Sequence, residues 1–156
     1  MSQPGRSSGS GRTARKLYPS KHVFSASRSK LYVTNIVKVR PRKEEGGSTQ
    51  NRPPGAGEIR EGIYLLKEEL DLVKPRALVL LGGTPAKALI KKSFTLKSEH
   101  GTPFDTEFGV PALATYHPAY LLRLRGAGSE DYDRMRQQVV EDLGAAWEHA
   151  QGSHDG

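Results

Sequence analysis

Three short apolar runs, each leading into a polar or glycine-containing turn, most constrain the fold of this chain. They occupy residues 31–37 (LYVTNIV), 77–81 (ALVLL) and 110–116 (VPALATY). Short, nearly continuous apolar runs rich in β-branched and aromatic residues are typical of strands buried on both faces. Helical patterns separate and follow them, so the sequence predicts an α/β fold with a parallel sheet covered on both sides.

The helices are indicated by apolar spacing and by end signals. An apolar stripe with spacings of three and four ends before Pro75, and Thr84 followed by Pro85 predicts the capped start of a short helix reaching Ile90. Ser129 is expected to cap the last helix, with Glu130 and Asp131 in its first turn. Residues 41–57 are expected to form a loop, and 93–108 an irregular stretch or small hairpin. The expected buried residues of the first and last helices are Ile59, Ile63, Leu66, Leu70, Val73, Met135, Val139, Leu143, Ala146 and Trp147.

Charge divides the chain into a tail and a domain. The net charge of +7 comes entirely from residues 1–30, which hold seven Lys or Arg and no acid, whereas the remainder is neutral. We expect a disordered basic tail over 1–29, one domain over 30–150 and a disordered end over 151–156. A DNA-binding arm, a solvated tail, a targeting segment and a wrongly assigned gene start all remain open for the first segment.

Two absences limit the kind of protein. The chain has no cysteine, which excludes disulfides, thiol catalysis and cysteine-bound metal centres, and we expect no metal or other cofactor. No apolar run approaches the roughly 20 residues that span a bilayer. We therefore expect a monomeric cytoplasmic protein that does not bind membranes.

Polar groups follow each predicted strand. Asn35 and Lys38 end the first, Gly83 and Thr84 follow the second, and His117 with Pro118 follows the third. Ligands of open α/β sheets bind beyond the carboxyl ends of the strands, so the candidate site lies there. His22, His100, His149 and His154 are expected to be ordinary surface histidines.

The segments YVTNIVKVRP, LLGGTPAKAL and TYHPAYLLR, in this order and spacing, resemble the uracil-DNA glycosylases, most closely their thermophile-type, iron–sulfur branch. The resemblance covers about residues 30–148. It implies a three-layer α/β/α sandwich that hydrolyses the bond between uracil and deoxyribose in DNA during base-excision repair, with uracil-containing DNA as the partner.

The resemblance assigns roles to individual residues. Asn35 matches the asparagine that reads uracil, accepting from N3–H and donating to O4, whereas an asparagine ending a strand in a turn is the alternative. His117 matches the histidine facing uracil O2, where a fixed donor stabilises charge developing on the leaving base; a capping or core histidine is the alternative.

The remaining matched positions concern DNA. Pro118, Leu121, Leu122 and Arg123 match the loop that enters the duplex when a base flips out, although Leu121 and Leu122 could equally be core residues at a helix start. Gly83 and Thr84 at a helix start, and Lys38 nearby, could contact phosphate.

Two departures from the family pattern leave alternatives open. Residues 1–30 contain neither the Gly-Glu-x-Pro-Gly motif whose acid activates water nor the stacking Phe, so the N-terminal strand is expected to be missing. Val39 stands where the iron–sulfur branch has a cysteine, so no cluster is expected. The alternatives to an active glycosylase are a catalytically silent DNA-binding remnant and an unrelated nucleotide-binding α/β domain.

Overall fold

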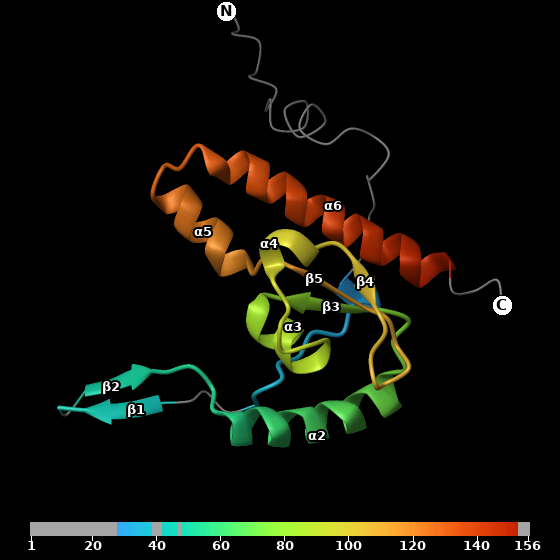
Figure 1. Cartoon of the computed structure of the whole chain (residues 1–156), viewed down its shortest axis with the longest axis horizontal. Coiled ribbons are helices and arrows are strands. Elements are labelled where there is room, and N and C mark those ends of the chain that lie inside the picture. The colour runs from blue at the N-terminus through green and yellow to red at the C-terminus, as the bar shows by residue number, and fades with distance from the viewer. Residues whose placement is uncertain (1–27, 39–41, 47, 153–156) are drawn as a thin grey trace, which may run out of the picture.

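The computed structural model describes residues 28–38, 42–46 and 48–152, and it shows an α/β fold with a short sheet (Figure 1). The expectation of a tail over 1–29 falls almost wholly outside these residues and stays a prediction, as does that for residues 153–156. None of the described helices is long and apolar enough to cross a membrane. The elements in chain order are η2 (Arg28–Lys30), β1 (Arg42–Glu45), β2 (Ser48–Asn51), α2 (Ala56–Val73), β3 (Leu78–Leu81), α3 (Gly83–Leu89), α4 (Leu96–Glu99), β4 (Pro103–Phe104), β5 (Ala112–Thr115), α5 (Pro118–Gly126) and α6 (Asp131–Gly152).

The central sheet has three strands in the order β3-β5-β4. Strands β3 and β5 are parallel, with Leu78 opposite Ala112 and Leu81 opposite Thr115. Strand β4 runs antiparallel to β5. The second and third predicted strands are therefore confirmed as a parallel pair, but the sheet as a whole is mixed.

The sheet lies between helices on its two faces, with α2 on one side and α6 on the other (Figure 1). Every residue of β5 is buried. Ala112 and Ala114 join the cluster on the α2 side, whereas Thr115 bonds to a side chain of α6. A strand buried on both faces is what its apolar sequence predicts.

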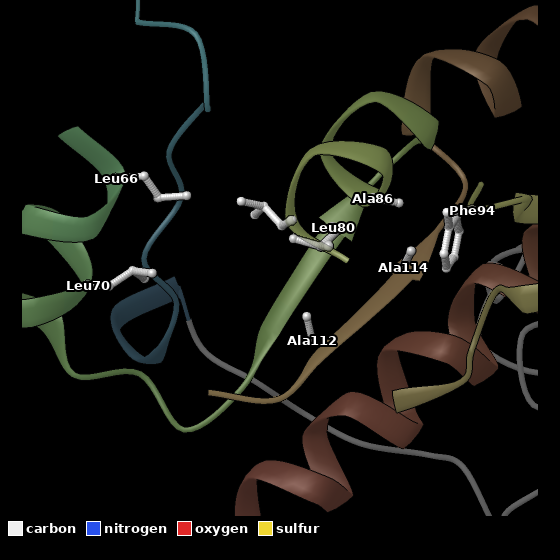
Figure 2. Packing of buried hydrophobic residues seen from close by; sticks show 8 residues of the cluster. Leu66, Leu70, Leu80, Ala86, Phe94, Ala112 and Ala114 are labelled. Atoms are coloured by element: carbon white, nitrogen blue, oxygen red, sulfur yellow. The ribbon is translucent and has the colours of Figure 1, made fainter. Parts of the chain in front are cut away.

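The main core lies between α2, α3 and the sheet (Figure 2). Leu66 and Leu70 of α2 face Leu80 of β3, and Phe94 closes the far end of the cluster at 2 % exposure. The Phe94 ring meets that of Phe104 edge to face, with centroids 5.8 Å apart. The stripe predicted for the first long helix is thus confirmed at its centre, where burial of these side chains stabilises the fold.

The prediction of a strand over residues 31–37 is wrong. Residues 31–35 have no regular structure and lead into a bend, and Leu31, Tyr32 and Val33 are 47–66 % exposed. The segment lies against α2 instead, where Ile36 packs on the core and its carbonyl faces Gly62. A strand needs a neighbour that pairs with its backbone, and apolar composition alone does not supply one.

Three smaller expectations also need correction. The predicted loop over 41–57 contains an antiparallel hairpin of β1 and β2. The last two residues of this range, 56 and 57, already belong to α2. Helix α3 begins at Gly83, so its N-cap is Gly82 and not Thr84. Gly82 has φ 98°, a conformation that favours glycine. The stretch over 93–108 holds α4 and β4.

Candidate functional site

The carboxyl ends of β3 and β5 meet at the candidate site because the two strands are parallel and in register. The backbone N–H of Gly82, directly after β3, donates to the Thr115 carbonyl at the end of β5 (2.8 Å). A Cβ added to Gly82 would lie 3.6 Å from the Cβ of His117. The structure therefore brings together Gly82, Gly83 and His117 from segments more than 30 residues apart in the chain, as the strand pattern predicts.

His117 is the N-cap of α5. Its backbone is extended (φ −68°, ψ 138°), and its Nδ1 accepts a hydrogen bond from the Ala119 N–H at 3.0 Å. A ring nitrogen that accepts carries no proton, so a neutral His117 has its proton on Nε2. The side chain is exposed, and Nε2–H is a donor directed by the cap. The capping role was the alternative to catalysis, but only Nδ1 makes the cap, and no described residue bonds to Nε2.

The segment matched to a DNA-entering loop is the helix α5. Leu121 is half-buried, whereas Leu122 is 67 % exposed and Arg123 is exposed as well. The Arg123 guanidinium lies 6.0 Å from the centre of the Tyr120 ring. Leu122 is therefore no core residue, and α5 presents an apolar side chain and a cation to solvent beside His117.

Gly83 and Thr84 form the first two positions of α3, next to the N-cap Gly82. Thr84 is exposed, and a Cβ on Gly83 would meet nothing within 4 Å. The space around the Cβ position of Gly83 is therefore open.

Asn35 and Lys38 lie in the irregular segment that packs on α2. Asn35 is exposed. The Lys38 ammonium forms an ion pair with Glu69 of α2 (2.7 Å) and donates to the Thr34 hydroxyl (2.7 Å). The hydrogen bond from Lys38 lowers the pKa of the Glu69 carboxyl, against the opposing effect of burial. Lys38 thus anchors the segment that carries Asn35.

A buried polar network at the end of β5 was missed from the sequence. Asp142 of α6 is 5 % exposed and accepts from Thr115 Oγ1 (2.5 Å) and from His100 Nδ1 (2.8 Å). His100 is therefore not the ordinary surface histidine that was expected. The available signal was Asp142 itself, which lies three residues after Val139 and four before Ala146, on the buried stripe of the last helix.

The hollows found among the described residues lie away from the carboxyl ends of β3 and β5. One of about 520 Å³ is a depression open to solvent on the last turns of α6, beside Glu148 and His149. A small apolar cavity of about 60 Å³ lies at the opposite ends of the strands, among Leu78, Pro111 and Ala112. Ligand pockets are usually roughly 300–1,000 Å³, so this one is too small for a base. The described residues include no group of three His, Asp or Glu side chains arranged to hold a metal ion.

Comparison with known proteins assigns the family. The model of the uracil DNA glycosylase superfamily matches residues 8–144. The type-4 uracil-DNA glycosylase of Thermotoga maritima is 29% identical over 117 residues, which cover 74% of this chain and 54% of that protein. The type-4 enzyme of Pyrobaculum aerophilum is 31% identical over 114 residues, or 67% of this chain and 55% of that protein.

A type-5 uracil-DNA glycosylase of Pyrobaculum aerophilum is 37% identical over 93 residues, covering 58% of this chain and 37% of that protein. The chain spans about half the length of the type-4 relatives that it matches. The family match includes β3, β5 and α5, whose ends form the candidate site. With its matched region, its α/β fold and its strand-end histidine, the chain belongs to the uracil-DNA glycosylase superfamily.

Proposed function

We propose that this chain excises uracil from DNA by hydrolysing the N-glycosidic bond, as a component of base-excision repair. The observation that carries the proposal is the Nε2–H of His117, a donor left available at the strand ends because Nδ1 caps α5. The family assignment and the type-4 relatives support the same chemistry.

His117 would act on the leaving base. When the bond between deoxyribose C1′ and uracil N1 breaks, its electron pair stays on uracil. A water oxygen bonds to C1′ and releases its proton to solvent, and solvent protonates the uracil anion after it leaves. A donor held at the position of uracil O2 stabilises the negative charge that develops there, and a neutral imidazole suffices for this. The proposal therefore needs His117 to donate a hydrogen bond and not to transfer a proton.

Asn35 would read the base. Its side-chain carbonyl can accept from uracil N3–H and its amide can donate to O4, a pattern that cytosine reverses. A mismatched polar group costs roughly 1–3 kcal/mol when buried against the base. The exposed Asn35 lies in a segment fastened to α2 by Lys38 and Glu69, which leaves its amide accessible to a flipped base.

Helix α5 and the turn after β3 would hold the DNA. An exposed Leu122 can fill the space that the flipped base leaves, and Arg123 can pair with a phosphate, offsetting a flipping cost of a few kcal/mol. Pro118 and Leu121 would shape this helix, while Gly83 and Thr84 would approach the backbone. Lys38 would contact phosphate only by leaving Glu69.

The test is cleavage of a labelled oligonucleotide that holds one uracil, single-stranded or in a duplex, followed by hot alkali. We expect cleavage at uracil and none at cytosine. His117→Ala should slow excision by about 100–1,000-fold, the usual loss for one donor to a developing anion. Asn35→Asp should do at least as much harm, because a carboxylate has no donor for O4.

The matched control is His149→Ala. His149 is also an exposed histidine, but it borders the cavity at the opposite ends of the strands. It should leave excision unchanged. Excision that survives both His117→Ala and Asn35→Asp would place the site elsewhere.

The alternative is a DNA-binding protein without glycosylase activity, and it is tested by measuring DNA binding with the same protein and oligonucleotides. No excision by the wild type, together with DNA binding that weakens as salt is raised, would establish it, since phosphate contacts give salt-dependent affinity without chemistry.

A further inference from the structure

Asp142 is a buried carboxylate that the proposed chemistry does not use. It lies on the face of α6 that packs on the sheet, among apolar residues such as Met135, Val139 and Ala146. Its Oδ2 accepts from Thr115 Oγ1 at 2.5 Å, and His100 Nδ1 lies 2.8 Å from Oδ2 and 3.1 Å from Oδ1. Two donors from different segments therefore converge on one carboxylate.

The surrounding backbone is shaped to admit this carboxylate. Gly101 has φ 72°, and a Cβ there would lie within 2.3 Å of Asp142 Oδ1. The Gly101 N–H donates to the Ala114 carbonyl (2.9 Å), so the turn after α4 is bonded to β5 directly as well as through Asp142. Burying a carboxylate costs several kcal/mol unless donors compensate, and an apolar residue would fill a packing position more cheaply. Asp142 thus links α6 to the strand end through directional bonds to Thr115 and His100.

The bonds and ring contacts of Asp142 and His100 hold Thr115 and Tyr116, the two residues directly before His117. Thr115, fixed to Asp142 by its hydroxyl, also accepts the Gly82 N–H through its carbonyl. The ring of Tyr116 lies between those of His100 and Tyr120, with centroids 5.4 Å and 5.7 Å away. His117 itself is exposed, so its place beyond the sheet is set by the backbone that these contacts hold.

We propose that Asp142, His100 and Thr115 form a positioning network for His117, holding the end of β5 so that the Nε2 donor meets the base. This inference rests on the proposed function for its kinetic consequence, but the network also predicts a local effect that can be measured without activity. Thr115 and Asp142 are buried, and the His100 side chain is only 21 % exposed, so the proposal has all three act through the backbone of β5. They are positioning residues.

The variants are chosen in matched pairs. Thr115→Val removes the hydroxyl at nearly constant volume, and Thr115→Ser restores it. His100→Leu removes the donor to Asp142, whereas His100→Asn retains an N–H near the position of Nδ1. Because the His100 side chain is 21 % exposed, this pair carries the test if Thr115→Val does not fold.

The kinetic arm measures uracil excision by the full chain under saturating and limiting oligonucleotide. A displacement of about 1 Å at a reacting group can cost on the order of 100-fold, so kcat should fall by about 10–100-fold in Thr115→Val and His100→Leu. KM should change less than kcat, because none of the three side chains is itself proposed to contact DNA. Thr115→Ser and His100→Asn should recover most of the rate. An unchanged kcat in an active background would overturn the proposal.

The structural arm measures amide hydrogen exchange. In Thr115→Val and His100→Leu, the Gly82 N–H, which bonds to the Thr115 carbonyl, should exchange at least tenfold faster. The Lys74 N–H, which bonds to Leu70 in α2, should keep its wild-type rate. Equal acceleration at both amides, or none at Gly82, would reduce the network to ordinary stabilisation and refute the positioning role. If the wild type proves inactive while Gly82 responds selectively, the proposed function fails and the network remains as a support of the strand end.

Discussion

Replacing Gly62 by alanine tests how the segment that carries Asn35 is held. In the interior of an exposed helix this change usually stabilises a protein by roughly 0.5–1 kcal/mol. In α2, however, the new Cβ would lie 1.8 Å from the Ile36 carbonyl oxygen. That oxygen would have to withdraw by about 1.5 Å to reach ordinary van der Waals contact.

The sign of the effect should therefore reverse. Forcing a methyl group into a filled contact costs roughly 1–3 kcal/mol, which exceeds the helical gain and leaves a net loss of about 1 kcal/mol. For a chain of this size the melting temperature should fall by about 2–4 °C. Uracil excision should also weaken through a higher KM, because Asn35 precedes the displaced Ile36.

Gly57→Ala is the matched control. Gly57 lies in the first turn of the same helix, and an added Cβ would meet nothing within 4 Å. Thermal melting followed by circular dichroism should show a small gain or no change for this variant. A Gly62→Ala protein as stable as Gly57→Ala, with unchanged KM, would show that residues 31–38 do not rest on α2 as described.

Two further predictions concern the surface. Leu122→Ala should change stability by less than about 0.5 kcal/mol, since Leu122 is 67 % exposed, but it should slow excision from duplex DNA more than excision from single strands. Leu72 is 84 % exposed on α2, so the control variant Leu72→Ala should alter neither rate. The hydrogen bonds that Glu58 accepts from Arg52 and from the Gly55 N–H lower the pKa of its carboxyl group from 4.5 to about 2. The charged carboxylate therefore contributes fully to stability above pH 4.5, and this contribution is lost as the pH falls towards 2. The difference in melting temperature between wild type and Glu58→Gln should shrink across that interval, and a constant difference would contradict the assignment.

The fold could be predicted from sequence where a segment with the apolar pattern of a strand also has a neighbouring strand to pair with. The runs at β3 and β5 are flanked by helices and pair with each other. Their parallel alignment, and the approach of the turn after β3 to His117, therefore followed from the rule that parallel strands end at the same edge of a sheet. Residues 31–37 carry an equally strong apolar pattern, but a strand depends on a pairing edge that composition does not report. Instead, Lys38 bonds to Glu69, and Ile36 meets a helix at a glycine.

The position of the candidate site in the fold could be predicted better than the contacts that support it. His117 stood out because it follows a strand within a motif, and its capping bond is local in sequence. The pairing of His100 with Asp142 joins residues 42 positions apart, and no local signal links them. Gly82 as the N-cap was missed because Thr84 has the side chain typical of an N-cap, whereas the positive φ of a glycine leaves no such signal in the sequence.

The bond between His117 and Ala119 also explains why the residue between them is a proline. Pro118 has no N–H, so the first amide that the imidazole can meet is that of Ala119, and its fixed φ already suits the first turn of a helix. The three consecutive residues His117, Pro118 and Ala119 therefore determine which ring nitrogen accepts the capping bond and which is left to donate.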